Sequence, residues 1–456
     1  MLDSEAHDTQ AARLAVSEFS SYSDGIEGLL LDLAQSSHAQ VSDQVISGIL
    51  NGQAASALKE LVPLNVRREA GLFFTSTRLA DMAADRLAPR LRRGARLLDP
   101  ACGAGNLLLA CAKHLPSGNC LTETLRMWSD LIVGYDLHHE FIRAAKLRLV
   151  LLAASRHPEE SETLRSIQLP SVFAGLTVGD FFEDACLDDV GCIVVNPPFG
   201  YIAAPVHCGW STGRTQTAGY FFERLLRLAH KGQHIVAILP DVLRSGTRYC
   251  RWRATVSKVC SSLEVEPLGQ FDKDADVDVF MLHGVVGDSS KKLSDWLNLG
   301  PTKRDFSQTV GDFFEVHVGP VVPHRDPLSG PGYPYIRART APAWQTLHHI
   351  NDERKYSGTV FDPPMVVVHR TSSPSDRYRC IATLVDEKRK VAVENHLLVL
   401  QPKDRSMETC ARLLDLLRQD ETSEWMNRRI RCRHLTVSAL RELPWLGTER
   451  REHQCT

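Results

Sequence analysis

The chain has 456 residues, of which 43% are hydrophobic, and a formal net charge of −2 at pH 7. This length exceeds one ordinary hydrophobic core, so we expect two domains and an extension. No apolar run approaches the roughly 18 residues of a membrane span, and the N-terminus lacks the basic and apolar regions of a secretory signal. The small net charge argues against a simple nucleic-acid coat protein.

The number and spacing of the cysteines indicate the redox compartment of the protein and whether a metal site is expected. The 12 cysteines are scattered, with no Cys-x-x-Cys pair and no matching His-x-x-x-His. This spacing disfavours both a zinc site and a disulfide framework. We therefore expect a protein of the reducing cytoplasm, with no metal and no membrane association.

Residues 1–65 have the apolar spacing of helices, for example Ile26, Leu29, Leu30 and Leu33. They carry no chemical motif, so we interpret them as a helical extension that caps the next domain or a partner. Gly71-Leu72-Phe73-Phe74-Thr75-Ser76-Thr77 follows. Its hydroxyl residues cap the next helix in one interpretation; in the other, the two aromatics belong to a ligand lid.

The stretch Asp99-Pro100-Ala101-Cys102-Gly103-Ala104-Gly105-Asn106 combines an acid with small residues. We expect a short strand to end at Asp99 and a helix to run from about Leu107 to Leu115. Glycine lets a backbone approach a ligand closely, and a helix N-terminus offers free N–H groups. A lone Gly-x-Gly is weak support, but here it lies between a strand and a helix. The absence of Gly-Lys-Ser/Thr excludes a nucleoside-triphosphate loop.

Two further predicted strands, over residues 131–136 and 176–180, also end in acids. Asp136 is placed to accept the hydroxyl groups of a ribose, although it could equally cap the next helix. Asp180 could accept an adenine amine while Phe181 stacks on the ring. Carboxylates gathered at one sheet edge repel each other unless a ligand supplies donors. We expect His138 and the residue after it to be surface residues.

The apolar run 193–195 reads as a buried parallel strand that ends in Asn196-Pro197-Pro198-Phe199. The prolines prevent both strand pairing and helix formation. The Asn196 side-chain oxygen and the Pro197 carbonyl can then point the same way, beside the Phe199 ring. Two fixed acceptors and a flat ring suit a planar amine, although a strand ending in a proline turn is the simpler interpretation.

Residues 200–217 read as a mobile loop, and 235–240 as a fifth parallel strand. Segments 267–271 and 277–282 indicate a closing hairpin, with Phe271 able to reach the crevice. Five alternations of strand and helix predict an α/β fold with a doubly wound sheet.

The pattern changes near residue 286, where short apolar runs separated by Pro and Gly predict a small mixed or mostly β domain. Residues 301–456 hold 24 Lys and Arg against 20 Asp and Glu, whereas the first 300 hold 29 against 35. This asymmetry weakly favours a polyanionic partner for the C-terminal part. Its arginines could contact phosphate or guanine, or simply be surface residues: Arg325, Arg337, Arg339, Arg370, Arg377, Arg379, Arg428, Arg429, Arg431 and Arg433.

The order Gly-Leu-Phe-Phe-Thr, Asp-Pro-Ala-Cys-Gly-Ala-Gly-Asn, Gly-Tyr-Asp, Gly-Asp-Phe and Asn-Pro-Pro-Phe resembles the gamma-class adenine-N6 DNA methyltransferases of restriction–modification and defence systems. The resemblance implies a class I methyltransferase fold with a seven-stranded sheet over residues 66–285. It implies a mixed α/β target-recognition domain over 286–456, where the match is looser. Residues 1–65 remain a helical extension.

The resemblance also implies roles for single residues. S-adenosylmethionine is expected at Phe74, Thr75, Asp99, Pro100, Ala101, Gly103, Gly105, Asn106, Asp136, Leu137, Asp180 and Phe181. The catalytic residues are expected to be Asn196, Pro197, Pro198 and Phe199, with the target adenine stacked between Phe199 and Phe271. Phe199 stands where many relatives have Tyr, which keeps the stacking surface and removes a hydroxyl.

The expected partner is double-stranded DNA, together with a companion restriction or defence protein that supplies any cleavage. Two other readings stay open: methylation of RNA or of a protein glutamine, since related enzymes also use Asn-Pro-Pro, and a non-catalytic DNA-binding subunit. The motif before Asp99 and the long C-terminal region favour DNA. The intact residues 196–199 argue against loss of catalysis.

Overall fold

The computed structural model describes residues 16–35, 43–167, 171–183, 185–287, 296 and 308–445. The chain divides into two compact units. Unit 1 comprises residues 1–244 and 248–296, and unit 2 comprises residues 245–247 and 297–456. Within the described ranges, no helix has both the length and the apolar character of a membrane span.

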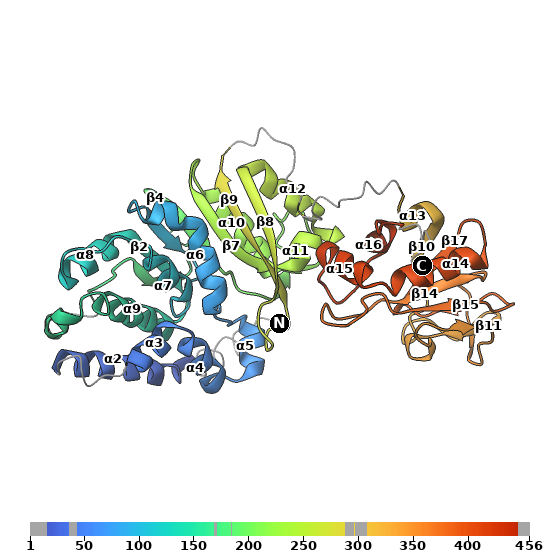
Figure 1. Cartoon of the computed structure of the whole chain (residues 1–456), viewed down its shortest axis with the longest axis horizontal. Coiled ribbons are helices and arrows are strands. Elements are labelled where there is room, and N and C mark those ends of the chain that lie inside the picture. Colours follow the sequence, from blue (N-terminus) through green and yellow to red (C-terminus); the bar gives the residue numbers. More distant parts are fainter. Residues whose placement is uncertain are drawn as a thin grey trace, which may run out of the picture. The chain divides into compact units, whose positions relative to one another are not determined.

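Unit 1 is built on a seven-stranded sheet with the order β3-β2-β1-β4-β7-β9-β8 (Figure 1). The strands are β1 (Arg96–Asp99), β2 (Ile132–Asp136), β3 (Leu176–Val178), β4 (Val190–Val195), β7 (His234–Pro240), β8 (Cys260–Gln270) and β9 (Asp278–Val286). β3, β2, β1, β4 and β7 pair in parallel, and β9 is antiparallel to both of its neighbours. The predicted doubly wound sheet with its closing hairpin is confirmed.

The central strands are apolar along most of their length because both faces of the sheet are covered. β4 has the sequence Val-Gly-Cys-Ile-Val-Val, and its last four residues are buried. β7 is buried from Ile235 to Pro240. Continuous rather than alternating burial is typical of parallel strands with a helix layer on each face. A strand of this kind must end abruptly to expose a polar side chain, and β4 does so at Asn196.

The helices of unit 1 connect the strands by crossovers that run in two directions from the middle of the sheet. They are α6 (Thr77–Leu91), α7 (Asn106–Ala112), α8 (Leu121–Leu131), α9 (His139–Ala154), α10 (Thr217–Leu228), α11 (Asp241–Ser245) and α12 (Cys250–Val259), with 3₁₀ turns at Pro158–Ser166 and Thr247–Tyr249. β1 to β3 proceeds to one side, and β4 to β7 proceeds to the other. The direction of winding therefore reverses between β1 and β4, where open α/β sheets bind ligands.

Four N-terminal helices pack on this core: α2 (Ser20–Gln35), α3 (Asp43–Leu50), α4 (Gln53–Leu61) and α5 (Leu64–Ala70). α2 and α3 lie beside α9 (Figure 1). Ile26 and Leu30 are buried in the same hydrophobic cluster as the sheet. At the surface, Arg143 of α9 donates to Asp24 at 2.6 Å and also to Glu27. The described part of residues 1–65 is thus helical and packs on the sheet core, and residues 1–15 and 36–42 of the predicted extension lie outside the described residues.

α4 and α5 also hold the loop between β8 and β9 through charged contacts. Lys59 Nζ lies 2.6 Å from Asp272 Oδ2. Both terminal nitrogens of Arg67, a buried side chain, lie 3.1 Å from Asp274 Oδ2. Arg68 donates to the Asp274 carbonyl at 2.9 Å. The loop that follows Phe271 is therefore fixed by basic residues from a segment more than 200 positions earlier in the sequence.

One prediction about unit 1 is wrong. Residues 200–217, expected to be a mobile loop, contain an antiparallel hairpin of β5 (Tyr201–Ala203) and β6 (Arg214–Gln216). Thr215 is completely buried, and Arg248 donates to the carbonyl of Thr212 at 2.6 Å. The segment is rich in Gly, Ser and Thr, which reads as a loop, but strand pairing and the arginine order it.

Over its described residues, unit 2 contains two sheets. The five-stranded sheet has the order β10-β17-β14-β15-β12, and the three-stranded sheet has the order β13-β11-β16. Their bounds are β10 (Phe314–Val318), β11 (Gly332–Ile336), β12 (Thr346–Leu347), β13 (Glu353–Lys355), β14 (Met365–His369), β15 (Ala382–Val385), β16 (Ala392–Val393) and β17 (Leu397–Pro402). The helices are α13 (Val310–Phe313), α14 (Met407–Leu417), α15 (Asp420–Arg429) and α16 (Val437–Arg441), with a 3₁₀ turn at Ala338–Thr340. A mixed α/β unit, as predicted, is confirmed.

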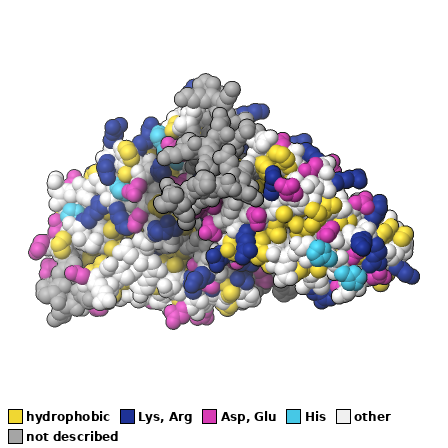
Figure 2. Space-filling view, turned by 45° about the vertical axis from the view of Figure 1, so that its right-hand side comes forward, with side chains coloured by type: hydrophobic (Ala, Val, Ile, Leu, Met, Phe, Trp, Pro, Cys, Tyr) yellow, Lys and Arg dark blue, Asp and Glu magenta, His cyan; other side chains and the backbone are white. Residues whose placement is uncertain are grey.

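Two arginines of unit 2 prove to be structural. Arg379 is completely buried and donates to the carbonyls of Ser372 and Cys432 at 2.7 and 2.9 Å. Arg429 is also buried and pairs with Glu442 at 2.6 Å. Both depart from the surface or DNA-contacting positions considered for them. On the face shown in Figure 2, Lys and Arg side chains form several separate groups, with Asp, Glu and apolar side chains between them.

We predict that Ile235→Ala in β7 lowers the free energy of unfolding by about 2–5 kcal/mol, because it leaves a cavity in a fully buried strand. Val206→Ala is the matched control, since that side chain is 97% exposed, and it should change stability by no more than about 0.5 kcal/mol. Denaturant unfolding followed by tryptophan fluorescence measures both. Equal effects of the two substitutions would contradict the burial of β7.

Candidate functional site

The site is built from the carboxyl ends of β1, β2 and β4 and from the segment that precedes α6. Ser76 is the N-cap of α6, and its hydroxyl accepts from the Leu79 N–H at 3.5 Å. Of the capping residues considered from the sequence, Ser76 takes the role. This frees the hydroxyl of the buried neighbour, Thr75, for another contact.

That contact is with Asn196, the residue directly after β4. Asn196 Nδ2 donates to Thr75 Oγ1 at 3.0 Å and to the Phe73 carbonyl at 3.4 Å. Because a carbonyl can only accept, the nitrogen of the amide must face this side. Asn196 Oδ1 is buried and has no hydrogen-bond partner. The amide is therefore held with a free acceptor oxygen, which native proteins rarely leave buried without a role.

The glycine-rich loop links β1 to α7. Gly103 and Gly105 have φ angles of 51° and 82°, which residues with a side chain rarely adopt. A Cβ on Gly103 would lie 2.8 Å from the Phe74 ring, and one on Gly105 would lie 3.0 Å from Ala145 Cβ. The loop thus needs glycine both for its turn and for its close packing against Phe74 and α9. Helix α7 is shorter than the helix expected from about Leu107 to Leu115.

Three predicted acids lie at the ends of neighbouring strands, and each has a different environment. Asp99 is completely buried, its Oδ1 accepts from the Ala101 N–H at 3.1 Å, and its Oδ2 has no partner. Asp136 accepts from the Gly103 N–H at 3.0 Å and from His138. Asp180 is exposed and accepts from the Phe182 N–H at 2.9 Å.

Burial raises the pKa of the Asp99 carboxyl to about 8; the hydrogen bond from Ala101 opposes this rise, and the negative charge of Asp136 adds to it. Burial also raises the pKa of the neighbouring Cys102 thiol, with the same two acids contributing. The strand ends thus form a region in which negative charge is costly until a cation or a set of donors enters.

A cavity of about 280 Å³ joins these groups. Its lining includes most of the cofactor and catalytic residues predicted from the sequence: Phe74, Thr75, Asp99, Pro100, Ala101, Gly103, Asn106, Asp136, Leu137, Asp180, Phe181, Asn196 and Pro198. Gly105, Pro197, Phe199 and Phe271 are not in the lining. Gly105 lies behind the loop against α9, and Pro197 is buried.

Phe199 and Phe271, the predicted pair around a target base, contact each other directly. Their ring centroids are 5.0 Å apart with an interplanar angle of 79°, and both side chains are buried. This edge-to-face arrangement is a normal aromatic contact and leaves no gap for a third ring. The structure brings the two residues together, but a base between them requires the rings to separate.

Sequence reasoning missed several residues that line the cavity. His138, expected at the surface, has a side chain only 15% exposed, and its Nδ1 lies 3.0 Å from Asp136 Oδ1. Arg224 lies over the Phe182 ring with its guanidinium carbon 3.9 Å from the ring centre. Tyr220, Phe221 and Phe141 complete this wall. Tyr220 and Phe221 lie four and three positions before Arg224 on α10. This helical spacing could have indicated that the three side chains share one face.

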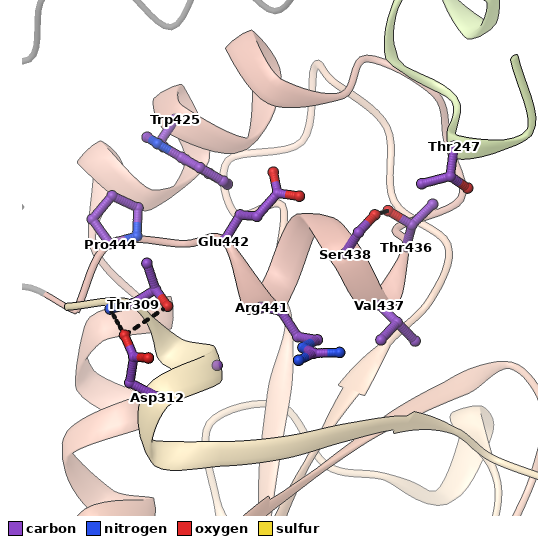
Figure 3. Close-up of a pocket in the computed structure, with 11 residues that line it drawn as sticks. Thr247, Thr309, Asp312, Trp425, Thr436, Val437, Ser438, Arg441, Glu442 and Pro444 are labelled. Carbon is purple, nitrogen blue, oxygen red and sulfur yellow. Dashed lines mark hydrogen bonds between the residues drawn. The ribbon is translucent and has the colours of Figure 1, made fainter. Parts of the chain in front are cut away.

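A larger hollow of about 900 Å³ lies in unit 2, around α16 and α13 (Figure 3). Its polar groups are mostly paired with each other or with neighbours. Asp312 Oδ2 accepts from the N–H and the hydroxyl of Thr309 at 2.7 and 3.0 Å. Glu442 pairs with Arg429, and Thr436 Oγ1 lies 3.2 Å from Ser438 Oγ. The unpartnered acceptors at Asp99 and Asn196 make the cavity in unit 1 the better candidate site.

Residues 62–221 match a family model described as N-6 DNA Methylase. The match confirms, for this part of the chain, the resemblance to adenine-N6 DNA methyltransferases found in the motifs. It includes the glycine-rich loop, the three acids and Asn196.

Several solved structures resemble this chain at low sequence identity, and one of them shares its fold with a TM-score above 0.5. The type IIL restriction-modification enzyme MmeI in complex with DNA is 12% identical over 85% of this chain and 70% of that chain, with a TM-score of 0.51. The type IIG restriction endonuclease BpuSI is 14% identical over 88% and 60%, with a TM-score of 0.44. The type I methyltransferase subunit from Streptococcus thermophilus is 14% identical over 53% and 51%, with a TM-score of 0.34. The chain thus spans less than two thirds of BpuSI.

The buried acid of this site generates a pH prediction. Between about pH 4 and about pH 8 the unfolded chain ionises Asp99 while the folded chain keeps it protonated. The neutral carboxyl therefore contributes stability that is complete below about pH 4 and is lost as the pH rises to about 8. We expect Asp99→Asn to lose less unfolding free energy than wild type over this range.

Denaturant unfolding at several pH values measures this difference. Asp130→Asn is the control, because that aspartate is exposed on α8. The same pH dependence in wild type and Asp99→Asn would show that Asp99 does not titrate abnormally.

Proposed function

We propose that this chain, which carries an N-6 DNA methylase domain over residues 62–221, transfers a methyl group from S-adenosylmethionine to the N6 amine of adenine in double-stranded DNA. The observation that carries the proposal is the buried, unpartnered Oδ1 of Asn196, which lines the same cavity as the glycine-rich loop. An exocyclic amine supplies the N–H donor that this oxygen lacks.

The residues around the cavity fit the proposed cofactor. S-adenosylmethionine is a nucleoside with cationic groups, and the lining offers Asp99 Oδ2 without a partner and Asp136 at the next strand end. We assign the methionine part to Phe74, Thr75 and residues 99–106. We assign the ribose to Asp136 and Leu137, and the adenine to Asp180 and Phe181. When bound, the cofactor supplies an electrophilic methyl group on a neutral leaving group.

The work of the chain is to make the target amine reactive. The lone pair of adenine N6 is delocalised into the ring, so the amine is a poor nucleophile. Hydrogen bonds accepted by Asn196 Oδ1 and, we propose, by the Pro197 carbonyl favour a pyramidal nitrogen with a localised lone pair. Because the acceptors are fixed before the base arrives, they need no reorganisation during the reaction. Positioning and electrostatics then suffice to start the transfer without a strong base. Exchange of the methyl group from sulfur to nitrogen leaves a neutral thioether and a positively charged N6, which then loses one proton to water.

Entry of the base requires a rearrangement at Phe199 and Phe271. Taking adenine out of the duplex costs a few kcal/mol. We propose that the flipped base replaces the contact between the two rings and stacks on Phe199. Stacking of a base on an aromatic side chain contributes about 1–3 kcal/mol and offsets part of this cost. Phe271 moves least easily, because Lys59, Arg67 and Arg68 fix the loop that follows it.

We assign residues 66–285 to catalysis and residues 286–456 to recognition of the DNA target. The setting we propose is restriction–modification or a related defence system, in which a companion protein supplies any cleavage. The support is the family match and the fold shared with MmeI, whose solved structure is a complex with DNA. RNA and protein glutamine remain as outcomes of the test described next.

Asn196→Ala should lower the rate of methyl transfer by at least about 10²-fold, because it removes the acceptor for the amine, while S-adenosylmethionine still binds. Transfer of a labelled methyl group to DNA, RNA and protein measures the rate and the substrate class together. Asn51→Ala, at an exposed position beyond α3, is the control. Turnover like that of wild type in Asn196→Ala would remove this residue from the mechanism, and methylation of RNA or protein alone would refute the DNA assignment.

Asp136→Ala should raise the dissociation constant of S-adenosylmethionine by at least about tenfold, because hydrogen bonds to a charged group contribute roughly 1.5–3 kcal/mol each. Titration calorimetry measures the constant directly. Asp130→Ala, which removes an exposed carboxylate at the end of α8, should leave it unchanged. An unchanged constant in Asp136→Ala would contradict the ribose assignment.

A further inference from the structure

Arg148 of α9 is a completely enclosed cation, with 1% of its surface exposed. Its three acceptors are neutral oxygens. Nε donates to the Ile49 carbonyl at 3.0 Å, and Nη1 donates to the Ala104 carbonyl at 2.5 Å and to Asn106 Oδ1 at 2.6 Å. Within the described part of the chain, no carboxylate forms an ion pair with it. Burying a charge without an ion-pair partner lowers the stability of the fold, so we expect Arg148 to have a role that offsets this cost.

The contacts of Arg148 continue to the catalytic amide. Asn106 turns its Oδ1 toward Arg148, so its Nδ2 is left to donate to the Thr75 carbonyl at 2.6 Å. Thr75 in turn presents Oγ1 to Asn196 Nδ2 at 3.0 Å. Two residues, Asn106 and Thr75, therefore lie between the charge of Arg148 and the Asn196 amide.

The direction of this relay is fixed by chemistry. Arginine has only donors and stays protonated, so it forces the oxygen of the Asn106 amide to face it. The Asn106 amide then has only its donors left for Thr75. The hydrogen bond that Asn106 donates to the Thr75 carbonyl fixes the backbone of residues 74–75. It thereby positions the Thr75 hydroxyl, which orients Asn196. A neutral residue at position 148 would leave Asn106 Oδ1 without its charged donor, and the Asn106 side chain would then be held only by its contact with Thr75.

We propose that Arg148 is a positioning residue for methyl transfer, which orients Asn196 through Asn106 and Thr75 and depends on α3 for one of its three contacts. The proposal rests on the proposed function, and it extends the working site into the N-terminal helices. The Ile49 carbonyl near the end of α3 is the contact that ties this extension to the chemistry.

The chain offers a matched control in Arg156, just after α9. It is also partly buried and donates mainly to backbone carbonyls, those of Ala112 and Lys113 at 3.1 and 2.8 Å. Arg148 therefore holds the beginning of α7, and Arg156 holds its end. Both substitutions with Met remove an arginine that braces the same helix, but only position 148 connects to Asn196.

We expect Arg148→Met to lower kcat for methyl transfer to DNA by about ten- to hundred-fold, with a smaller change in the dissociation constant of S-adenosylmethionine. Arg156→Met should lose stability and keep its kcat. In a double-mutant cycle, Arg148→Met should cost less in a Thr75→Val background, because the relay is already broken. Additive effects in that cycle, or equal kcat losses in the two arginine variants, would overturn the proposal.

A second variant covers the case in which Arg148→Met does not fold. Asn106→Asp keeps an acceptor for Arg148 and removes the donor to Thr75. Because Asn106 also lines the cofactor cavity, the readout for this variant is the position of Thr75 and Asn196 and not kcat: a purely structural role for Arg148 predicts that both stay in place, whereas the relay predicts that Thr75 is displaced.

Failure of the proposed function can be distinguished from failure of this inference. A wild-type chain that methylates no DNA would refute the function. Crystal structures of wild type and of Arg148→Met or Asn106→Asp would then decide the inference alone: a displaced Thr75 or a turned Asn196 amide supports it, and identical positions overturn it.

Discussion

The hydrogen bond from Asn196 Nδ2 to Thr75 Oγ1 decides which end of the amide faces the cavity. It is possible because β4 stops at Asn196, where prolines follow, and because Ser76 relieves Thr75 of capping α6. Thr75 lies just before α6 and Asn196 lies just after β4, so the fold joins two segments that are distant in the sequence. Besides bringing the motifs together, the fold therefore fixes the orientation of the Asn196 side-chain amide.

This arrangement places several energetically unfavourable buried groups close to the cavity of unit 1. Asn196 Oδ1 and Asp99 Oδ2 lack partners, and Arg148 is buried among neutral oxygens. A large apolar cluster extends from the sheet to the N-terminal helices, and other buried charges of unit 1, such as Arg244 and Asp241, are paired with each other. Such a division is expected where a protein keeps a site ready for a ligand, because the surrounding core must hold groups that would otherwise turn toward water.

The strands and their polar ends could be read from the sequence because each depends on a few neighbouring residues. An apolar run that stops at Asp99, Asp136 or Asn196 is a local signal. The pairing of Asn196 with Thr75 is not, since 121 residues separate them. The burial of Arg429 on α15 is not a local signal either, because its ion-pair partner Glu442 lies 13 positions later, beyond the end of that helix. The contact between Phe199 and Phe271 likewise needs the closed sheet.

The contacts of α4 and α5 with residues 272–274 have a consequence for biosynthesis. Helices α3, α4 and α5 have 8, 9 and 7 residues, too few for a stable helix in isolation. Lys59 is synthesised 213 residues before its ion-pair partner Asp272, so this contact cannot form until Asp272 has left the ribosome. Helices α4 and α5 are therefore secured only after the β8–β9 hairpin has emerged, whereas α2, which carries Ile26 and Leu30, packs against α9 and the turn at Pro158–Ser166, which are made earlier. That interval is when chaperones would be needed most.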